Sequence, residues 1–315
     1  MRWIDLHCDV LSKLWRDPDL SFYEEREETG LDVTYPRASR AGVGMQVFAI
    51  FVSPSVPRAQ TWEAALAQVD LFYEKVVIGE RQVFPVLDRS DVKRLGTDKR
   101  LGALLLLEGA DAIQGELSHL RLLHRLGVRM VGLTWNYANE VADGIEEERG
   151  GGLTRFGRTF VQEMARLGII LDVSHLSVRG FWEVMEMTEV PVLASHSNCR
   201  AICPHRRNLE DDQIRALIQR DGLIGLTFVP KFLHPDPDQA RVDDLFRHLD
   251  HLLELGAEHH IAFGSDFDGI DQKVPGLENT GDLPELEKLL ARRYPEHLRI
   301  GCQRENAHRF LLKHL

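Results

Sequence analysis

Eight short apolar segments recur along the chain, and they limit the folds it can adopt more than any other feature. Each is rich in Val, Ile, Leu or Phe, and none alternates cleanly between apolar and polar residues. Continuous apolar runs of this kind are typical of parallel strands that are covered on both faces. The predicted strands are residues 4–8, 44–52, 101–107, 128–135, 168–173, 190–195, 222–229 and 260–265.

Amphipathic stretches separate most of these runs. They cover residues 61–78, 117–126, 157–167, 177–187, 211–220 and 242–255. Alternation of β-type and helical segments predicts an α/β protein with a parallel sheet, and eight strands favour a (β/α)8 TIM barrel. We expect one such domain over residues 1–315. The alternative is an open, doubly wound sheet, but no Gly-x-Gly-x-x-Gly motif follows the first run to favour it.

Composition narrows the class of protein further. Hydrophobic residues make up 43% of the 315 residues, which is enough for a large core, and the formal net charge is −11. An acidic chain without a basic face is a poor partner for nucleic acid. There is no signal-peptide pattern and no apolar run near the roughly 20 residues of a membrane span. The four cysteines form no Cys-x-x-Cys motif, so we expect a soluble, cytoplasmic protein with free thiols and no membrane partner.

Ionisable side chains directly follow five of the predicted strands. In a (β/α)8 barrel, functional groups lie at the carboxyl ends of the strands, so we expect these side chains to meet at one end. Within the first run, alternation along a strand would also turn both of its polar groups to one face and Cys8 to the other. The residues are His7 and Asp9 at the end of the first run, Glu108 after the third, His175 after the fifth, His196 after the sixth and Asp266 after the eighth.

Three imidazoles together with carboxylates suit zinc or a similar transition metal. A carboxylate has two oxygens and can bridge two ions, which makes Glu108 the natural bridge between two metals. Two ions that share a water lower its pKa to about 7, and Asp266 would then accept and return a proton. Each group also has an ordinary structural interpretation, as a histidine bonded to a carbonyl, a carboxylate paired with arginine or a loop cap. Their common placement favours the metal site.

In these segments the chain resembles the membrane (renal) dipeptidase family of zinc peptidases, within the metal-dependent amidohydrolases. The resemblance spans nearly the whole chain and is carried by residues 5–9, 107–110, 153–157, 171–175, 195–198, 205–208 and 265–269. It implies a (β/α)8 barrel with two zinc ions that hydrolyses dipeptides with a free C-terminal carboxylate through a metal-bridging hydroxide. It implies metal ligation by His7, Asp9, Glu108, His175 and His196, with Glu108 as the bridge and Asp266 as the acid and base.

The resemblance also suggests substrate contacts. Arg207 stands where the family has an arginine that grips the substrate carboxylate, a task that suits its planar fork. His205, two residues earlier, is a second candidate contact. Where the renal enzyme has Leu-Thr-His after the fourth strand, this chain has Trp135 followed by Asn136, so Asn136 is the candidate oxyanion donor. Val229 replaces a tyrosine of the renal enzyme and would alter one pocket wall.

Two other functions are compatible with the same residues. An amidohydrolase could act instead on N-acyl amino acids, cyclic amides or lactams, and a panel of such substrates would separate it from a dipeptidase. A non-catalytic metal-binding barrel would hold zinc without turnover, and the presence of Asp266 argues against it. The partner that we expect is a dipeptide substrate, and the family resemblance makes a homodimer plausible.

Overall fold

A computed structural model of the chain describes residues 3–26, 30–187 and 190–315. Over these residues the backbone forms one parallel sheet of nine strands. Because β1 pairs with both β2 and β9, and β2 also pairs with β4, eight of the strands close into a barrel. The strands are β1 (Trp3–Asp5), β2 (Val43–Phe51), β3 (Val83–Pro85), β4 (Leu101–Glu108), β5 (Val128–Gly132), β6 (Ile170–Asp172), β7 (Val192–Ala194), β8 (Leu223–Leu226) and β9 (Ile261–Phe263). The prediction of a (β/α)8 barrel is confirmed, and the open sheet is excluded.

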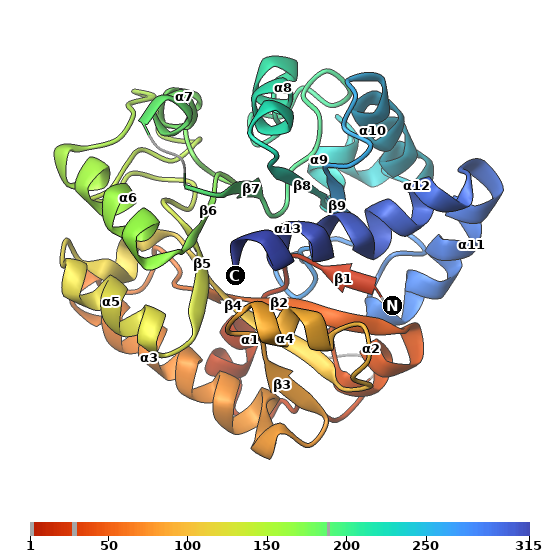
Figure 1. The fold of residues 1–315 in the computed structure, drawn as a ribbon, viewed down its shortest axis with the longest axis horizontal. Coiled ribbons are helices and arrows are strands. Elements are labelled where there is room, and N and C mark those ends of the chain that lie inside the picture. The colour runs from red at the N-terminus through yellow and green to blue at the C-terminus, as the bar shows by residue number, and fades with distance from the viewer. Residues whose placement is uncertain (1–2, 27–29, 188–189) are drawn as a thin grey trace.

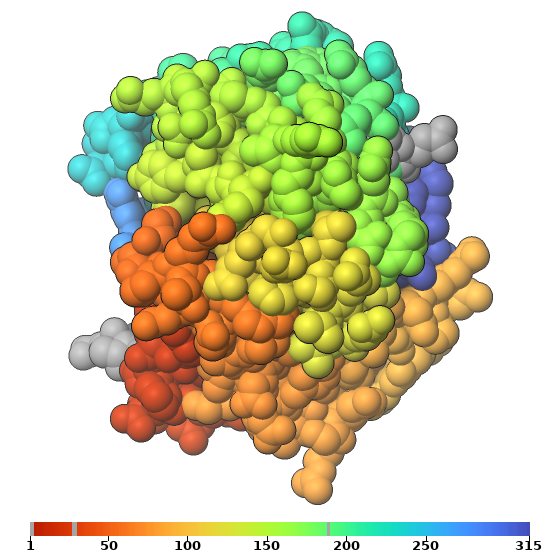
Figure 2. Space-filling model, turned by 90° about the vertical axis from the view of Figure 1, so that its left-hand side faces the viewer, coloured from red at the N-terminus to blue at the C-terminus, as the bar shows by residue number. Residues whose placement is uncertain are grey.

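Helices surround this barrel, as Figure 1 shows. They are α1 (Val10–Arg16), α2 (Tyr35–Ala41), α3 (Thr61–Leu71), α4 (Arg89–Arg94), α5 (Leu117–Arg125), α6 (Arg155–Leu167), α7 (Val178–Met187), α8 (Asp211–Gln219), α9 (Pro230–Leu233), α10 (Val242–Glu254), α11 (Leu283–Arg293), α12 (Glu296–Ile300) and α13 (Asn306–His314). On the side drawn in Figure 2, the segments from orange through yellow to green lie side by side in chain order. None of the helices in the described ranges is long and apolar enough to cross a membrane.

The core has two layers, which explains why the strand sequences lack alternation. In β4, Leu104 and Leu106 face the barrel interior, whereas Leu105 and Leu107 pack against the surrounding helices. Both faces are therefore apolar. By the same two-residue period, Glu108, the last residue of β4, faces the barrel interior. It lies at the end of the interior layer of apolar side chains.

The last helix closes the opposite end of the barrel. Ala307, Phe310 and Leu311 of α13 belong to the same buried cluster as the interior side chains of the strands. Figure 1 shows α13 lying across the ring of strands. Together with α11 and α12, α13 forms the last helical part of the chain.

Several element boundaries differ from the predicted ones. β1 ends at Asp5, so His7 and Asp9 lie beyond the strand, although Cys8 is buried in the core as expected. The helix expected over residues 61–78 ends at Leu71 and continues as a π-helical turn. β3 was not predicted, because its three residues carry too little pattern. It pairs with the first residues of β4, and β5 pairs with the later residues of β4.

Candidate active site

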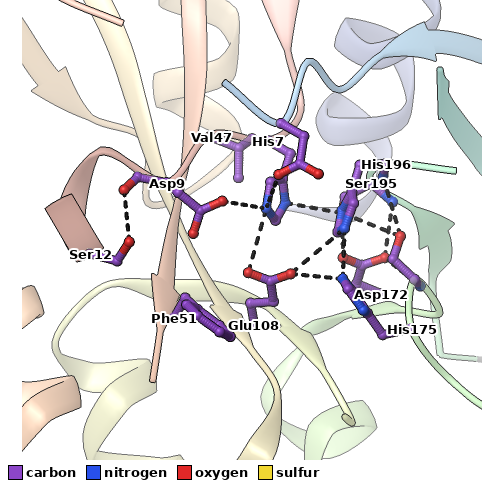
Figure 3. Close-up of polar contacts among 12 residues, drawn as sticks. His7, Asp9, Ser12, Val47, Phe51, Glu108, Asp172, His175, Ser195 and His196 are labelled. Atoms are coloured by element: carbon purple, nitrogen blue, oxygen red, sulfur yellow. Dashed lines mark hydrogen bonds and ion pairs between the residues drawn. The ribbon is translucent and has the colours of Figure 1, made fainter. Parts of the chain in front are cut away.

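The side chains predicted to converge do meet at the carboxyl ends of the strands (Figure 3). His7 Nε2 lies 3.5 Å from Asp9 Oδ2, 3.6 Å from Glu108 Oε2 and 3.9 Å from Asp266 Oδ1. Asp266 reaches this position because β9 pairs with β1, and its backbone N–H donates to the His7 carbonyl at 3.2 Å. Groups separated by more than 250 positions in the sequence therefore share one cluster.

A second group of ligating atoms lies on the other side of Glu108. Its Oε1 is 2.9 Å from His175 Nε2 and 3.6 Å from His196 Nε2, and these two nitrogens are 2.8 Å apart. The two oxygens of Glu108 thus face different sets of residues, with His7 on one side and His175 with His196 on the other, as Figure 3 shows.

The protons on these imidazoles are fixed by hydrogen bonds outside the cluster. Asn136 Oδ1 lies 2.7 Å from His175 Nδ1, and a carbonyl oxygen can only accept, so His175 Nδ1 carries the proton. The Ser195 hydroxyl donates to Asp172 Oδ2 at 2.5 Å and is left to accept from His196 Nδ1 at 2.8 Å. In both rings Nε2 therefore presents a lone pair to the cluster.

The sequence reasoning assigned no role to Asp172 or Ser195. Asp172 is a buried carboxylate within β6 that also accepts the backbone N–H groups of Ser174 and Ser195. A charged residue inside an otherwise apolar strand is the signal that could have identified it, because a buried charge requires partners.

This arrangement of donors fits metal ions. Two imidazole lone pairs that point at each other across 2.8 Å repel, and a cation between or beside them would remove that repulsion. In addition, His7 Nε2 and Asp9 Oδ1 are buried and have no hydrogen-bond partner within residues 3–26, 30–187 and 190–315. In the part of the chain that the structure describes, two groups of side chains offer ligand atoms within 4.8 Å of one another: His7 with Glu108 and His196, and His7 with Asp9 and Asp266. Buried polar atoms normally find partners, so their convergence here is consistent with a metal centre.

Burial shifts the proton affinities of the cluster. Burial raises the pKa of Asp266 to about 8, with the Asp9 and Glu108 carboxylates adding to the effect and His7 opposing it. Burial and the positive charge of Arg207 lower the pKa of His175 to about 3, which keeps its ring neutral and available as a ligand. For His7, burial lowers the pKa, but the Glu108 and Asp9 carboxylates outweigh it and raise the pKa well above its ordinary value.

The backbone conformation helps to orient the side chains of the cluster. His175 and Asp266 adopt φ values of +68° and +64°, a left-handed conformation that non-glycine residues rarely adopt. Gly269 packs so closely on the cluster that a Cβ at this position would lie well inside van der Waals contact with the carboxylates of Asp9 and Asp266. Only glycine fits there without displacing them.

A cavity of about 240 Å³ opens onto the cluster. Asp9, Glu108, His175 and Asp266 line its floor. On one side its wall is aromatic, formed by Phe51 and Trp135, whose rings are 5.3 Å apart; on the other side it is charged and includes Lys13, Arg16 and Lys231. The cavity can therefore hold a small polar ligand against the cluster of imidazoles and carboxylates.

Comparison with known proteins identifies the family. Residues 1–313 match the family model described as membrane dipeptidase (peptidase family M19). The chain belongs to the membrane dipeptidase family.

The relatives of this family member include solved structures and curated sequences. The structure of dipeptidase AC, a metallopeptidase, superposes with a TM-score of 0.92 at 30% identity and covers 100% of this chain and 98% of that one. A Rhodobacter sphaeroides metallopeptidase, solved with a phosphinate mimic of the dipeptide L-Ala-D-Ala, superposes with a TM-score of 0.93 at 29% identity, over 100% and 99% of the two chains.

Among curated sequences, dipeptidase aclJ of Aspergillus oryzae is 33% identical over 282 residues, which are 86% of this chain and 67% of the fungal protein. A Schizosaccharomyces pombe protein named as an uncharacterized dipeptidase is 32% identical over 273 residues, 82% of this chain and 66% of that one. This dipeptidase-family chain thus spans about two thirds of the two fungal proteins. Membership makes it an enzyme of the metallo-dipeptidase class.

The remaining predicted residues of this dipeptidase lie at different distances from the cavity. Arg207 is buried behind the cavity and is not among the residues that line it. Its Nη2 donates to the His196 carbonyl at 3.3 Å, and its Nε has no hydrogen-bond partner among the residues that the structure describes. His205 is half-buried, accepts the Arg207 N–H at 3.2 Å and packs on Phe232, but it is not among the residues that line the cavity. Asn136 and Val229 both line it.

Proposed function

We propose that this protein hydrolyses dipeptides with a free C-terminal carboxylate at a binuclear zinc centre. The observation that carries the proposal is the position of Glu108, whose two oxygens face two separate sets of ligating side chains. His7 and Asp9 would hold one ion, and His175 and His196 the other, with Glu108 shared between them. Two zinc ions bound there would polarise the scissile carbonyl and lower the pKa of a water to about 7.

The chain's own residues supply the proton transfer. Asp266 lies beside His7 and Asp9, and its carboxylate lines the cavity. When the oxygen of a water attacks the peptide carbonyl carbon, the water loses a proton, and Asp266 is placed to accept it. Asp266 then gives that proton to the amine that leaves as the C–N bond breaks, which returns the carboxylate to its starting state.

Arg207 supplies recognition of the substrate terminus. Its guanidinium is buried beside the His196 carbonyl, and over the described residues its Nε is unpaired. A buried unpaired donor favours an acidic ligand. A free carboxylate at the end of a dipeptide would satisfy it. Binding of the terminal carboxylate by Arg207 would limit the length of the substrate, because the carboxylate must lie one residue beyond the scissile bond.

The experiment is metal removal and titration. Protein stripped by a chelator and shown by elemental analysis to contain no metal should not cleave L-Ala-L-Ala or L-Ala-D-Ala, and activity should return with two zinc ions per chain. Turnover by metal-free protein, or full recovery at one zinc per chain, would contradict the proposal. Parallel assays of N-acetyl-alanine and of a lactam test the substrate class, since faster cleavage of these would favour a different amidohydrolase.

A further inference from the structure

The cavity has two unlike sides, and they come from different parts of the barrel. The aromatic wall follows β2 and β5, through Phe51 and Trp135. The cationic side follows β8 and β1, which flank β9: Lys231 lies in α9, and Arg16 ends α1. The carboxylates of Asp268 and Asp271 also line the cavity, so a cation there is available to a ligand only if it is not already paired.

Lys231 differs from Lys13, which lines the same cavity. Lys13 is already paired, because its Nζ lies 2.9 Å from Asp268 Oδ1. Within the described ranges, Lys231 has no carboxylate within 4.0 Å, and it is exposed. Asp271, an acidic neighbour on the cavity wall, forms no ion pair with it over the same residues. The charge of Lys231 is thus available to a ligand.

Lys231 and the arginine that is proposed to bind the substrate carboxylate both pack on Phe232. Lys231 Nζ and Arg207 Cζ are each 5.3 Å from the centre of the same Phe232 ring. Lys231 and Phe232 line the cavity, and Arg207 lies behind it against Phe232, so a dipeptide bound with its C-terminal residue toward Phe232 would bring the side chain of that residue toward Lys231. The amino-terminal residue then lies toward the aromatic wall of Phe51 and Trp135.

We propose that Lys231 selects dipeptides whose C-terminal residue has an acidic side chain, glutamate or aspartate. The inference rests on the proposed dipeptidase function and names its substrate class. An ammonium group at the cavity mouth attracts a carboxylate, whereas the isosteric amide of glutamine or asparagine offers only a neutral hydrogen bond.

The test compares matched substrates that differ only in charge. The measurement is the ratio of kcat/KM for Ala-Glu to that for Ala-Gln, for both the L and the D isomer of the second residue. The wild type should give a ratio of roughly 10, the size of one charge-assisted hydrogen bond in a partly exposed site. Lys231→Met should bring the ratio close to 1, Lys231→Glu should bring it below 1, and Lys231→Arg should keep it high.

A matched control is Lys93→Met, which removes an exposed lysine of α4 that does not line the cavity and should leave the wild-type ratio unchanged. Thermal unfolding of each variant shows whether it is folded. A wild-type ratio near 1, or a high ratio that survives both Lys231→Met and Lys231→Glu, would overturn the inference while leaving the dipeptidase function in place. Failure of the zinc-loaded wild type to cleave either dipeptide would overturn both.

Discussion

Asn136 Oδ1 accepts a hydrogen bond from His175 Nδ1 at 2.7 Å, and this contact turns the other nitrogen of the ring toward Glu108. The amide that sequence comparison suggested as an oxyanion donor thus has its carbonyl engaged in positioning an imidazole. Partners of this kind fix the tautomer of a metal-binding histidine and raise its basicity.

Replacing Asn136 by leucine should therefore weaken zinc binding about 10- to 100-fold, because His175 loses the group that holds its proton on Nδ1. Asn136→Asp keeps an acceptor in place and should retain most of the affinity. Competition with a chromophoric chelator measures both. If Asn136→Leu binds zinc like the wild type and loses only kcat, the amide acts on the substrate and not on the histidine.

Substituting Arg207 by alanine should raise KM for dipeptides with a free C-terminal carboxylate about 100-fold, since a buried charge-assisted hydrogen bond stabilises by roughly 1.5–3 kcal/mol. The same change should have little effect on C-amidated dipeptides, which lack that charge. Steady-state kinetics on the paired substrates decides the matter. An equal loss on both would show that Arg207 supports the His196 loop and does not recognise the carboxylate.

Adding one methyl group at Gly269 should nearly abolish activity without unfolding the protein. The new Cβ would displace the carboxylates of Asp9 and Asp266, and misplacement by about 1 Å can cost 100-fold in rate. Gly96→Ala is the matched control, because its nearest neighbour would be 3.9 Å away and its φ is not in the left-handed region. Wild-type kcat in Gly269→Ala would mean that the two carboxylates tolerate displacement.

A buried histidine away from the site should make stability depend on pH. His248 accepts the Cys199 N–H at 3.1 Å and contacts the Leu233 carbonyl at 3.2 Å, and burial lowers its pKa to about 4. Neutral His248 contributes to the free energy of unfolding. This contribution is fully present above the unfolded-state pKa of about 6.5, and it falls by about 3 kcal/mol at most as the pH drops toward 4.

Urea unfolding of His248→Gln between pH 7 and pH 4.5 should accordingly show a shallower loss of stability than the wild type. His297→Gln, at an exposed position, should keep the wild-type slope. A slope in His248→Gln as steep as that of the wild type would assign the acid sensitivity to other groups.

Much of the barrel was accessible from the sequence because strands covered on both faces must be apolar throughout. The same reasoning placed Glu108, His175, His196 and Asp266 at one end, since each ends such a run. What it could not supply is local backbone geometry. His175 and Asp266 take left-handed φ values after their strands, and β1 ends at Asp5, before the end of the strand that we predict over residues 4–8.

The groups behind the ligands were also missed, for a physical reason. A relay such as Asp172 to Ser195 to His196 crosses between neighbouring strands and depends on which strands pair, which only the folded sheet determines. The short strand β3 was not predicted, because three residues that end in proline are too few to show the two-residue alternation of a strand.

The position of α13 bears on how the protein is made. Phe310 and Leu311 fill the end of the barrel opposite the reactive groups, and β1, at the beginning of the chain, closes against β9. A ribosome-bound chain that stops before Asn306 would leave the inner surfaces of the strands open to water. We therefore expect the barrel to complete itself late in synthesis, and protease digestion of stalled nascent chains would detect the transition as a sharp gain in resistance once α13 emerges.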